Sequence, residues 1–258
     1  MITAAFLLTL STATPSDLDE AHRLFYNGRY DAADALTLTL CTDDLEGLAA
    51  CELRSSTLLF QIKRVIGGQR DKDRALKQCS RCAEWIAAFK AVTVSAQRVA
   101  RARLQAAPQD SDTRFLLGKI DLNYVWLQLG VLGHKTGWSE YWEARKSLDA
   151  VLKQAPGNIR AQVARAWIDY IVDTQMARGT RWVLGGGNKK RGLAMVRDAA
   201  ELDADPFVRA EAGFALWDMQ VREGETALAV DTARALARNF PENEELQKFL
   251  AHDGNVSH

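Results

Sequence analysis

A short turn followed by an apolar helix recurs along this chain and constrains its fold more than any other feature. The turn combines a small residue, an aromatic residue and an alanine at residues 28–33 and 139–144, and residues 224–229 keep all of these but the aromatic. Prolines close the helices at intervals of 48, 50 and 35 residues, at Pro108, Pro156, Pro206 and Pro241. A two-helix unit of about 35 residues cannot bury its apolar face alone, so such units stack on one another.

The composition fits a helical protein with a large core. Hydrophobic residues make up 47% and charged residues 26% of the 258 residues, and stretches of alternating polar and apolar residues bounded by turns are missing. We therefore predict an all-α fold, an α-solenoid of about five antiparallel helix pairs with a capping helix at the C-terminal end. The repeat domain is expected at residues 15–252 and a tail at 253–258, with one long helix across about 71–106.

The first fourteen residues form a separate segment. An apolar run at 2–10 is followed by small residues at 11–14, a pattern typical of a signal peptide, although no basic residue precedes the run. The alternative is an N-terminal segment that docks on the domain. Export predicts a periplasmic or secreted protein, and the alternative predicts a cytoplasmic one. The run is too short to span a membrane, and no transmembrane segment is expected in the mature chain.

The recurring turn, the closing proline and the unit of about 34 residues resemble the tetratricopeptide repeat (TPR), most clearly at residues 28–40, 139–156 and 205–241. The resemblance implies a right-handed solenoid whose concave face suits peptides or partner proteins. It also implies packing roles for Tyr30 and Tyr141. The repeat layout and the expected export resemble, more weakly, the extracytoplasmic TPR proteins that accompany TRAP-type transporters.

Two long proline intervals indicate insertions between the helices of consecutive pairs. The intervals of 48 and 50 residues place the extra residues near 130–139 and 175–190. Insertions at equivalent positions of neighbouring repeats lie on one face of a stack, so we expect these two loops to be side by side. This face is the predicted functional surface.

The two loops and the helix start that follows are basic, aromatic and rich in glycine, without a carboxylate. Three glycines at 185–187 precede a predicted helix, an arrangement that can bind an anion. Arginine and tryptophan are common anchors of binding surfaces. The candidate ligand- or partner-binding residues are His134, Lys135, Trp138, Arg178, Arg181, Trp182, Asn188 and Lys189. Alternatively, the glycines only let the loop turn back, the basic residues are solvated and the tryptophans fold inward.

The four cysteines offer one structural prediction. Cys41 ends one helix and Cys51 lies in the next, so an exported protein could join them in a disulfide; buried packing is the alternative. Cys79 and Cys82 form a C-x-x-C within the predicted helix 71–106, which argues against a thioredoxin-like role. No second pair completes a zinc site. We predict no metal and no cofactor.

These patterns favour a non-catalytic binding or assembly scaffold over an enzyme. The predicted partner is a protein or an acidic peptide, with a small anionic ligand as a further option, bound by the loops or by the concave helix face. Lys plus Arg and Asp plus Glu both number 33, so nothing points to nucleic acid. The alternatives are an enzyme that uses His134, or a transporter-associated solute-binding component with a pocket at the same loops.

Overall fold

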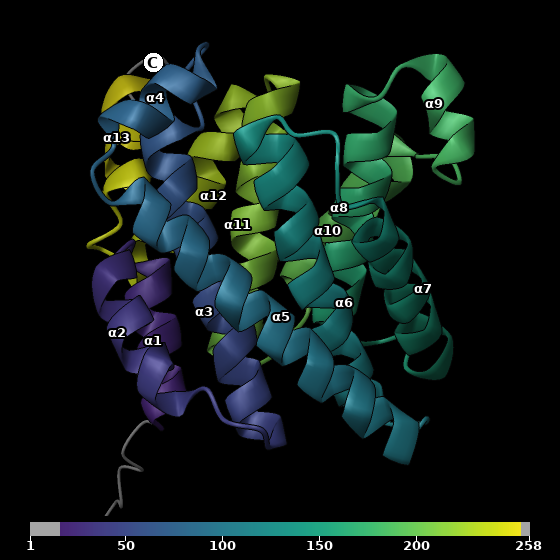
Figure 1. The fold of residues 1–258 in the computed structure, drawn as a ribbon. Coiled ribbons are helices and arrows are strands. Elements are labelled where there is room, and N and C mark those ends of the chain that lie inside the picture. The colour runs from purple at the N-terminus through teal and green to yellow at the C-terminus, as the bar shows by residue number, and fades with distance from the viewer. Residues whose placement is uncertain (1–15, 254–258) are drawn as a thin grey trace, which may run out of the picture.

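The computed structural model of the protein describes residues 16–253, and its regular elements in that range are all helices (Figure 1). The elements are α1 (Asp17–Tyr26), α2 (Tyr30–Leu40), α3 (Leu45–Ile66), α4 (Lys72–Gln78), α5 (Cys82–Ala106), α6 (Ser111–Val125), the π-helix η1 (Trp126–Leu132), α7 (Trp138–Gln154), α8 (Ile159–Gln175), α9 (Arg178–Val183), α10 (Lys189–Glu201), α11 (Pro206–Glu223), α12 (Thr226–Asn239) and α13 (Glu244–Asp253). The predicted all-α class is confirmed for this part of the chain.

The helices pack in the order in which they follow one another in the sequence. The most extensive contacts join α6 with α7, α8 with α10, α2 with α3, and α3 with α5; α11 with α12, α5 with α6, and α1 with α2 follow. The last helix, α13, packs on α12. None of the helices in residues 16–253 is long and apolar enough to cross a membrane. The expected signal peptide, residues 1–14, lies outside the described residues, as does the tail after residue 253.

The prolines mark the boundaries between pairs because each is coupled to a helix cap. The side chains of Asp110, Asn158 and Asn243 accept backbone N–H groups at the starts of α6, α8 and α13. Three prolines stand two residues before these caps: Pro108, Pro156 and Pro241. Pro206 is itself the first residue of α11, which Asp205 caps. The proline blocks extension of the preceding helix, and the cap starts the next one.

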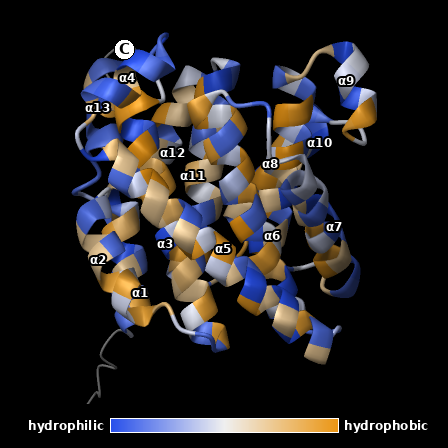
Figure 2. Cartoon of the chain, viewed as in Figure 1, coloured by the Kyte–Doolittle hydropathy of each residue, from blue (hydrophilic) through white to orange (hydrophobic). Residues whose placement is uncertain are grey.

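The expectation of one continuous helix across 71–106 is wrong, because the helix is interrupted between Gln78 and Cys82. Asp71 caps α4 through the backbone N–H of Arg74 at 2.9 Å, α4 ends at Gln78, and α5 starts at Cys82. Figure 2 shows α4 as a mainly hydrophilic helix on the outside of the array. The C-x-x-C therefore spans a junction between two helices and does not lie inside one.

Two disulfides lie in the N-terminal half of the array. Cys41 at the end of α2 is bonded to Cys51 in α3, as predicted, and Cys79 is bonded to Cys82. No cysteine of the chain is left free. Two disulfides are typical of proteins that fold in an oxidising, extracytoplasmic compartment.

The first and last helices meet, so the array closes on itself. The ring of Tyr26 in α1 stacks on Phe214 at 5.4 Å and contacts Phe240 at 5.3 Å between centroids. The side-chain amide of Asn243 donates to the Tyr26 carbonyl at 2.8 Å, and the backbone N–H of Glu242 donates to Asn27 Oδ1 at 3.1 Å. The ends of a simple solenoid do not touch, whereas α1 here contacts α11 and the start of α13.

A charge cluster lies between helices on the inner side of this closed array. Glu211 of α11 pairs with Lys119 and with Arg160, each at 2.6 Å, and Arg160 reaches Glu52 at 3.2 Å. Burial alone would raise the pKa of Glu211, but the two adjacent cations outweigh it and hold the pKa at about 2. Two carboxylates and two cations neutralise one another. The inner face thus joins α3, α6, α8 and α11 through ion pairs that are already satisfied.

Candidate functional site

Side chains of α7, the helix that follows the first insertion, hold the turn after α9 in the second insertion. The hydroxyl of Tyr141 donates to the Leu184 carbonyl at 2.8 Å, and Tyr141 itself is buried. The guanidinium of Arg145 donates to the carbonyls of Leu184 at 2.9 Å and of Gly185 at 2.8 Å. The N-terminal half of α7 therefore lies against the C-terminal end of α9. The buried Tyr141 has a packing role, as expected from the sequence.

The glycines before α10 serve the turn and close packing. Gly185 and Gly186 have φ angles of 76° and 73°, a left-handed conformation that favours glycine. A Cβ on Gly187 would lie 2.5 Å from the backbone nitrogen of Asp173, so α8 passes too close for a side chain. These contacts explain the run of three glycines without a ligand.

The start of α10 already holds a carboxylate from the same chain. Asn188 caps this helix by accepting the N–H of Arg191 at 2.9 Å, and the backbone N–H of Lys189 donates to Asp173 Oδ2 at 2.9 Å. The Asp173 carboxylate occupies the position that an anionic ligand would take at this helix end. The structure thus gives Asn188 a capping role.

Several basic residues in the second insertion and at the helix start after it are neutralised by carboxylates from neighbouring helices. Arg181 pairs with Asp173 of α8 at 2.6 Å, and Lys189 pairs with Glu223 of α11 at 2.7 Å. Arg191 pairs with the buried Asp169 of α8. The local positive field inferred from the loop sequences is therefore much reduced. Within the two insertions, the cations that form no ion pair with another described residue are the exposed Lys135, Arg178 and Lys190.

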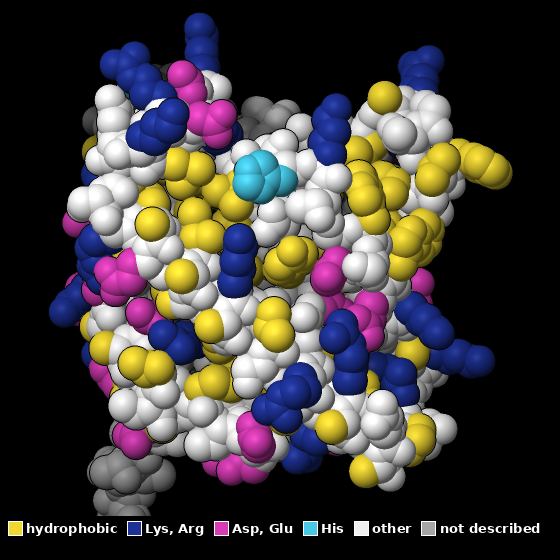
Figure 3. Space-filling view, viewed as in Figure 1, with side chains coloured by type: hydrophobic (Ala, Val, Ile, Leu, Met, Phe, Trp, Pro, Cys, Tyr) yellow, Lys and Arg dark blue, Asp and Glu magenta, His cyan; other side chains and the backbone are white. Residues whose placement is uncertain are grey.

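The tryptophans of the insertions point outward. Trp182 is 84% exposed and Val183 58%, while Trp138 and Trp142 in the first two turns of α7 are 41% and 43% exposed. We call these four residues the tryptophan edge. Figure 3 shows hydrophobic side chains protruding near α9 and the start of α7. Sequence reasoning did not include Trp142 among the candidate binding residues.

His134 takes a structural position at the end of η1. Its ring Nδ1 lies 3.1 Å from Oε1 of the buried Gln128, and its backbone N–H donates to the Gln128 carbonyl at 2.7 Å. Gly133 before it has a φ angle of 74°, the conformation that commonly ends a helix.

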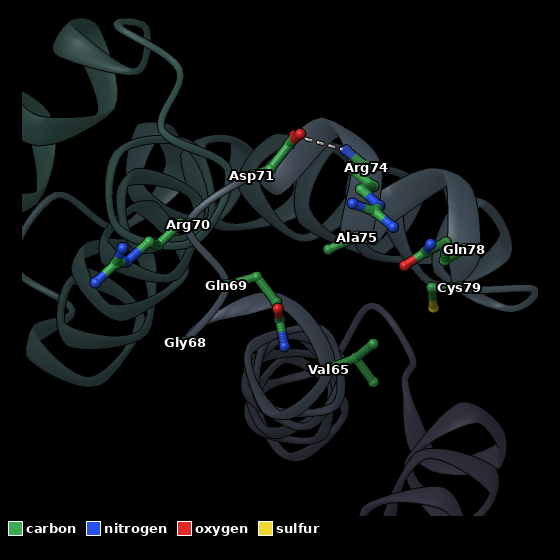
Figure 4. A pocket seen from close by; sticks show the side chains of 9 residues that line it. All are labelled: Val65, Gly68, Gln69, Arg70, Asp71, Arg74, Ala75, Gln78 and Cys79. Atoms are coloured by element: carbon green, nitrogen blue, oxygen red, sulfur yellow. Dashed lines mark hydrogen bonds between the residues drawn. The ribbon is translucent and has the colours of Figure 1, made fainter.

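A cavity that sequence reasoning did not foresee lies away from the tryptophan edge. It has a volume of about 510 Å³, is open to solvent, and is lined by the end of α3, the turn after it and one side of α4. Figure 4 shows its lining, which includes Val65, Gln69, Arg70, Arg74, Gln78 and Cys79. The only sequence signal near it was the C-x-x-C, which was interpreted as part of a helix.

In comparisons with known proteins, no family model, no curated protein and no solved structure matches the chain.

Proposed function

We propose that this chain is a non-catalytic binding protein built from TPR-like helix pairs, which recognises a partner protein through its tryptophan edge. The observation that carries the proposal is the 84% exposure of Trp182. A large aromatic side chain left in water on a well-held element is unfavourable for the isolated protein but is a typical anchor of an interface.

Support for the repeat assignment comes from the alanines of the recurring turn. Ala33, Ala144 and Ala229 hold equivalent positions in the three motif copies, and each is completely buried. A larger side chain at such a position would push the paired helices apart. The motif thus acts here through close helix packing, as the resemblance implies.

The anchoring of α9 favours a pre-formed binding surface. A helix of six residues is too short to be stable alone. It is held because Arg181 donates from Nε to the Met176 carbonyl at 2.9 Å and pairs with Asp173, while Arg145 fixes the turn that follows. A surface that is ordered before binding loses little conformational entropy when the partner docks.

The unpaired cations near the edge suggest the chemistry of the partner. Arg178 lies on α9, as do Trp182 and Val183, and Lys135 lies in the loop just before Trp138. The matching partner surface presents apolar side chains in its centre and carboxylates at its rim, as an acidic peptide segment or an acidic protein patch does.

The test is capture of partners from the compartment in which the protein resides, with purified wild type and variants as bait. For a captured partner, we expect Trp182→Ala to weaken binding by roughly tenfold or more, because removal of a central aromatic anchor commonly costs over 1 kcal/mol. The thermal midpoint of the variant should match that of the wild type, because the indole makes little contact with the rest of the protein.

The matched control is Leu38→Ala. It truncates another exposed hydrophobic side chain, 55% exposed, on the distant helix α2. Binding by this variant should equal that of the wild type. If Trp182→Ala binds the partner with full affinity, the tryptophan edge is not the binding surface, and the partner binds elsewhere on the array.

A further inference from the structure

The cavity beside α4 ends at a disulfide whose two sulfurs differ in access. Cys79 is half-buried and contributes to the cavity wall, with its side chain among those drawn in Figure 4. Cys82 is completely buried at the first position of α5. Of the two cysteines, Cys79 therefore borders the cavity and Cys82 does not.

This disulfide is poorly suited to act as a structural staple. It closes a loop with only two residues between the cysteines, whereas nine lie between Cys41 and Cys51. The entropy that a cross-link removes from the unfolded chain grows with loop length, so the smaller loop stabilises the fold less. Its turn is also closed by the backbone, because the N–H of Cys82 donates to the Cys79 carbonyl at 3.4 Å.

The location of Cys82 suits a leaving thiolate. It is the first residue of a 25-residue helix, where the backbone N–H groups and the helix dipole favour negative charge. Burial of Cys82 opposes a thiolate, and the helix N-terminus favours it. The interruption between α4 and α5 thus creates an asymmetric C-x-x-C, in which Cys79 is partly exposed and Cys82 is buried.

The cavity lining indicates which thiols can enter. Arg70 and Arg74 contribute two positive charges, and neither forms an ion pair with another described residue. The carboxylate of Asp71, which caps α4, also lines the cavity and contributes one negative charge, so the two arginines leave the lining net positive. A volume of about 510 Å³ is within the range of small-molecule sites. The cavity therefore suits a small thiol that carries carboxylates.

We propose that Cys79 and Cys82 form a thiol–disulfide exchange site, reached through the α3–α4 cavity by small anionic thiols. The thiolate of the incoming molecule attacks Sγ of Cys79, a mixed disulfide forms there, and the bond to Cys82 breaks with the electron pair leaving on Sγ of Cys82. A second thiol attacks the sulfur of the bound molecule and releases Cys79. Two thiols become one small-molecule disulfide, and their two protons and two electrons convert the protein disulfide to a dithiol.

The first experiment uses the wild-type protein and no substitution. The oxidised protein is equilibrated with glutathione, a tripeptide thiol with two carboxylates, at graded ratios of thiol to disulfide; free thiols are then alkylated in acid and mapped by mass spectrometry. We expect Cys79–Cys82 to open at roughly tenfold less reducing ratios than Cys41–Cys51, with the glutathione adduct on Cys79. Opening of both disulfides together, or an adduct that forms mainly on Cys82, would overturn the proposal.

The second experiment tests the charge selection. Initial rates of opening are compared for thioglycolate, an anionic thiol, and 2-aminoethanethiol, a cationic one, each corrected for its thiolate fraction. The wild type should react several-fold faster with thioglycolate, and the double variant Arg70→Gln, Arg74→Gln should lose this preference.

The matched control for charge selection is Lys77→Gln, which removes a cation of α4 that does not line the cavity. Equal preference in the cavity variant and the wild type, with unchanged helical content, would refute the role of the two arginines. Unchanged binding by Trp182→Ala would leave this redox proposal intact, because the two sites share no residue.

Discussion

At the scale of single residues, Asp121 on α6 makes the stability of the fold depend on pH. Its side chain is completely buried, and its Oδ1 accepts from Gln97 Nε2 at 2.6 Å. Burial raises the pKa of Asp121 from 3.8 to about 8, with Glu143 acting in the same direction. The folded protein therefore holds a proton here that the unfolded chain releases near pH 4, and stability falls as the pH rises from about 4 to about 8.

The corresponding prediction is that Asp121→Asn flattens this dependence, because the amide keeps the size of the side chain and cannot ionise. Across the window, the pH-dependent loss for the wild type is at most about 1.4 kcal/mol per pH unit. Urea unfolding at about pH 5 and about pH 8 measures it. Asp112→Asn on the exposed part of the same helix is the control and should retain the wild-type slope. An equal slope in both variants would contradict the assignment.

Sequence reasoning located residues at this scale only where the signal was local. The alanines of the recurring turn and the Cys41–Cys51 pair could be inferred from neighbours in the chain. The carboxylates that neutralise Lys189 and Arg191 could not, because they lie on other helices, 34 and 22 residues away. Charge composition within a loop does not reveal which charges the fold brings next to it.

At the scale of elements, α9 depends on one arginine of another helix. Arg145 donates to three consecutive carbonyls, of Leu184, Gly185 and Gly186. Arg145→Ala should lower the free energy of unfolding by about 1–3 kcal/mol, because three carbonyls lose hydrogen bonds from a charged donor. It should also increase proteolytic cleavage between residues 178 and 187. Lys146→Ala, at the exposed neighbouring position, should change neither quantity; equal cleavage of both variants would show that α9 is held by other contacts.

The break before α5 shows why one element was missed. No glycine or proline stands between Lys72 and Ala106, so nothing in the local sequence opposes a continuous helix. The break is set by tertiary structure: α4 packs back against α3, and the Cys79–Cys82 bond closes the turn. By contrast, the pair boundaries at 108, 156 and 241 could be predicted, because a proline and a capping residue mark each of them.

At the scale of the whole molecule, the closed array couples its two ends. Asn243 caps α13 and also donates to the Tyr26 carbonyl of α1. Asn243→Ala should therefore destabilise the fold by about 1–3 kcal/mol and speed hydrogen exchange in both α1 and α13. Asn239→Ala, which removes a weaker contact on the exposed end of α12, serves as the control. Faster exchange in α13 alone would indicate that the closure contributes little.

The sequence predicted the succession of helix pairs but not this closure. Pair formation follows from local periodicity and caps, whereas Tyr26 and Asn243 are 217 residues apart in the chain. The candidate site was predictable in part for the same reason: the insertions and the tryptophans are visible locally, and the cavity beside α4 is not.

The contact between Tyr26 and Asn243 also limits how the protein can change in evolution. Open repeat arrays lengthen or shorten by duplication or loss of whole units, because a new unit only needs to fit its two neighbours. Here an added helix pair would separate the residues that join the first helix to the last. The contacts between the two ends thus restrict the number of helices that the array can hold. New binding properties are expected to arise from insertions such as η1 and α9 and not from extra copies.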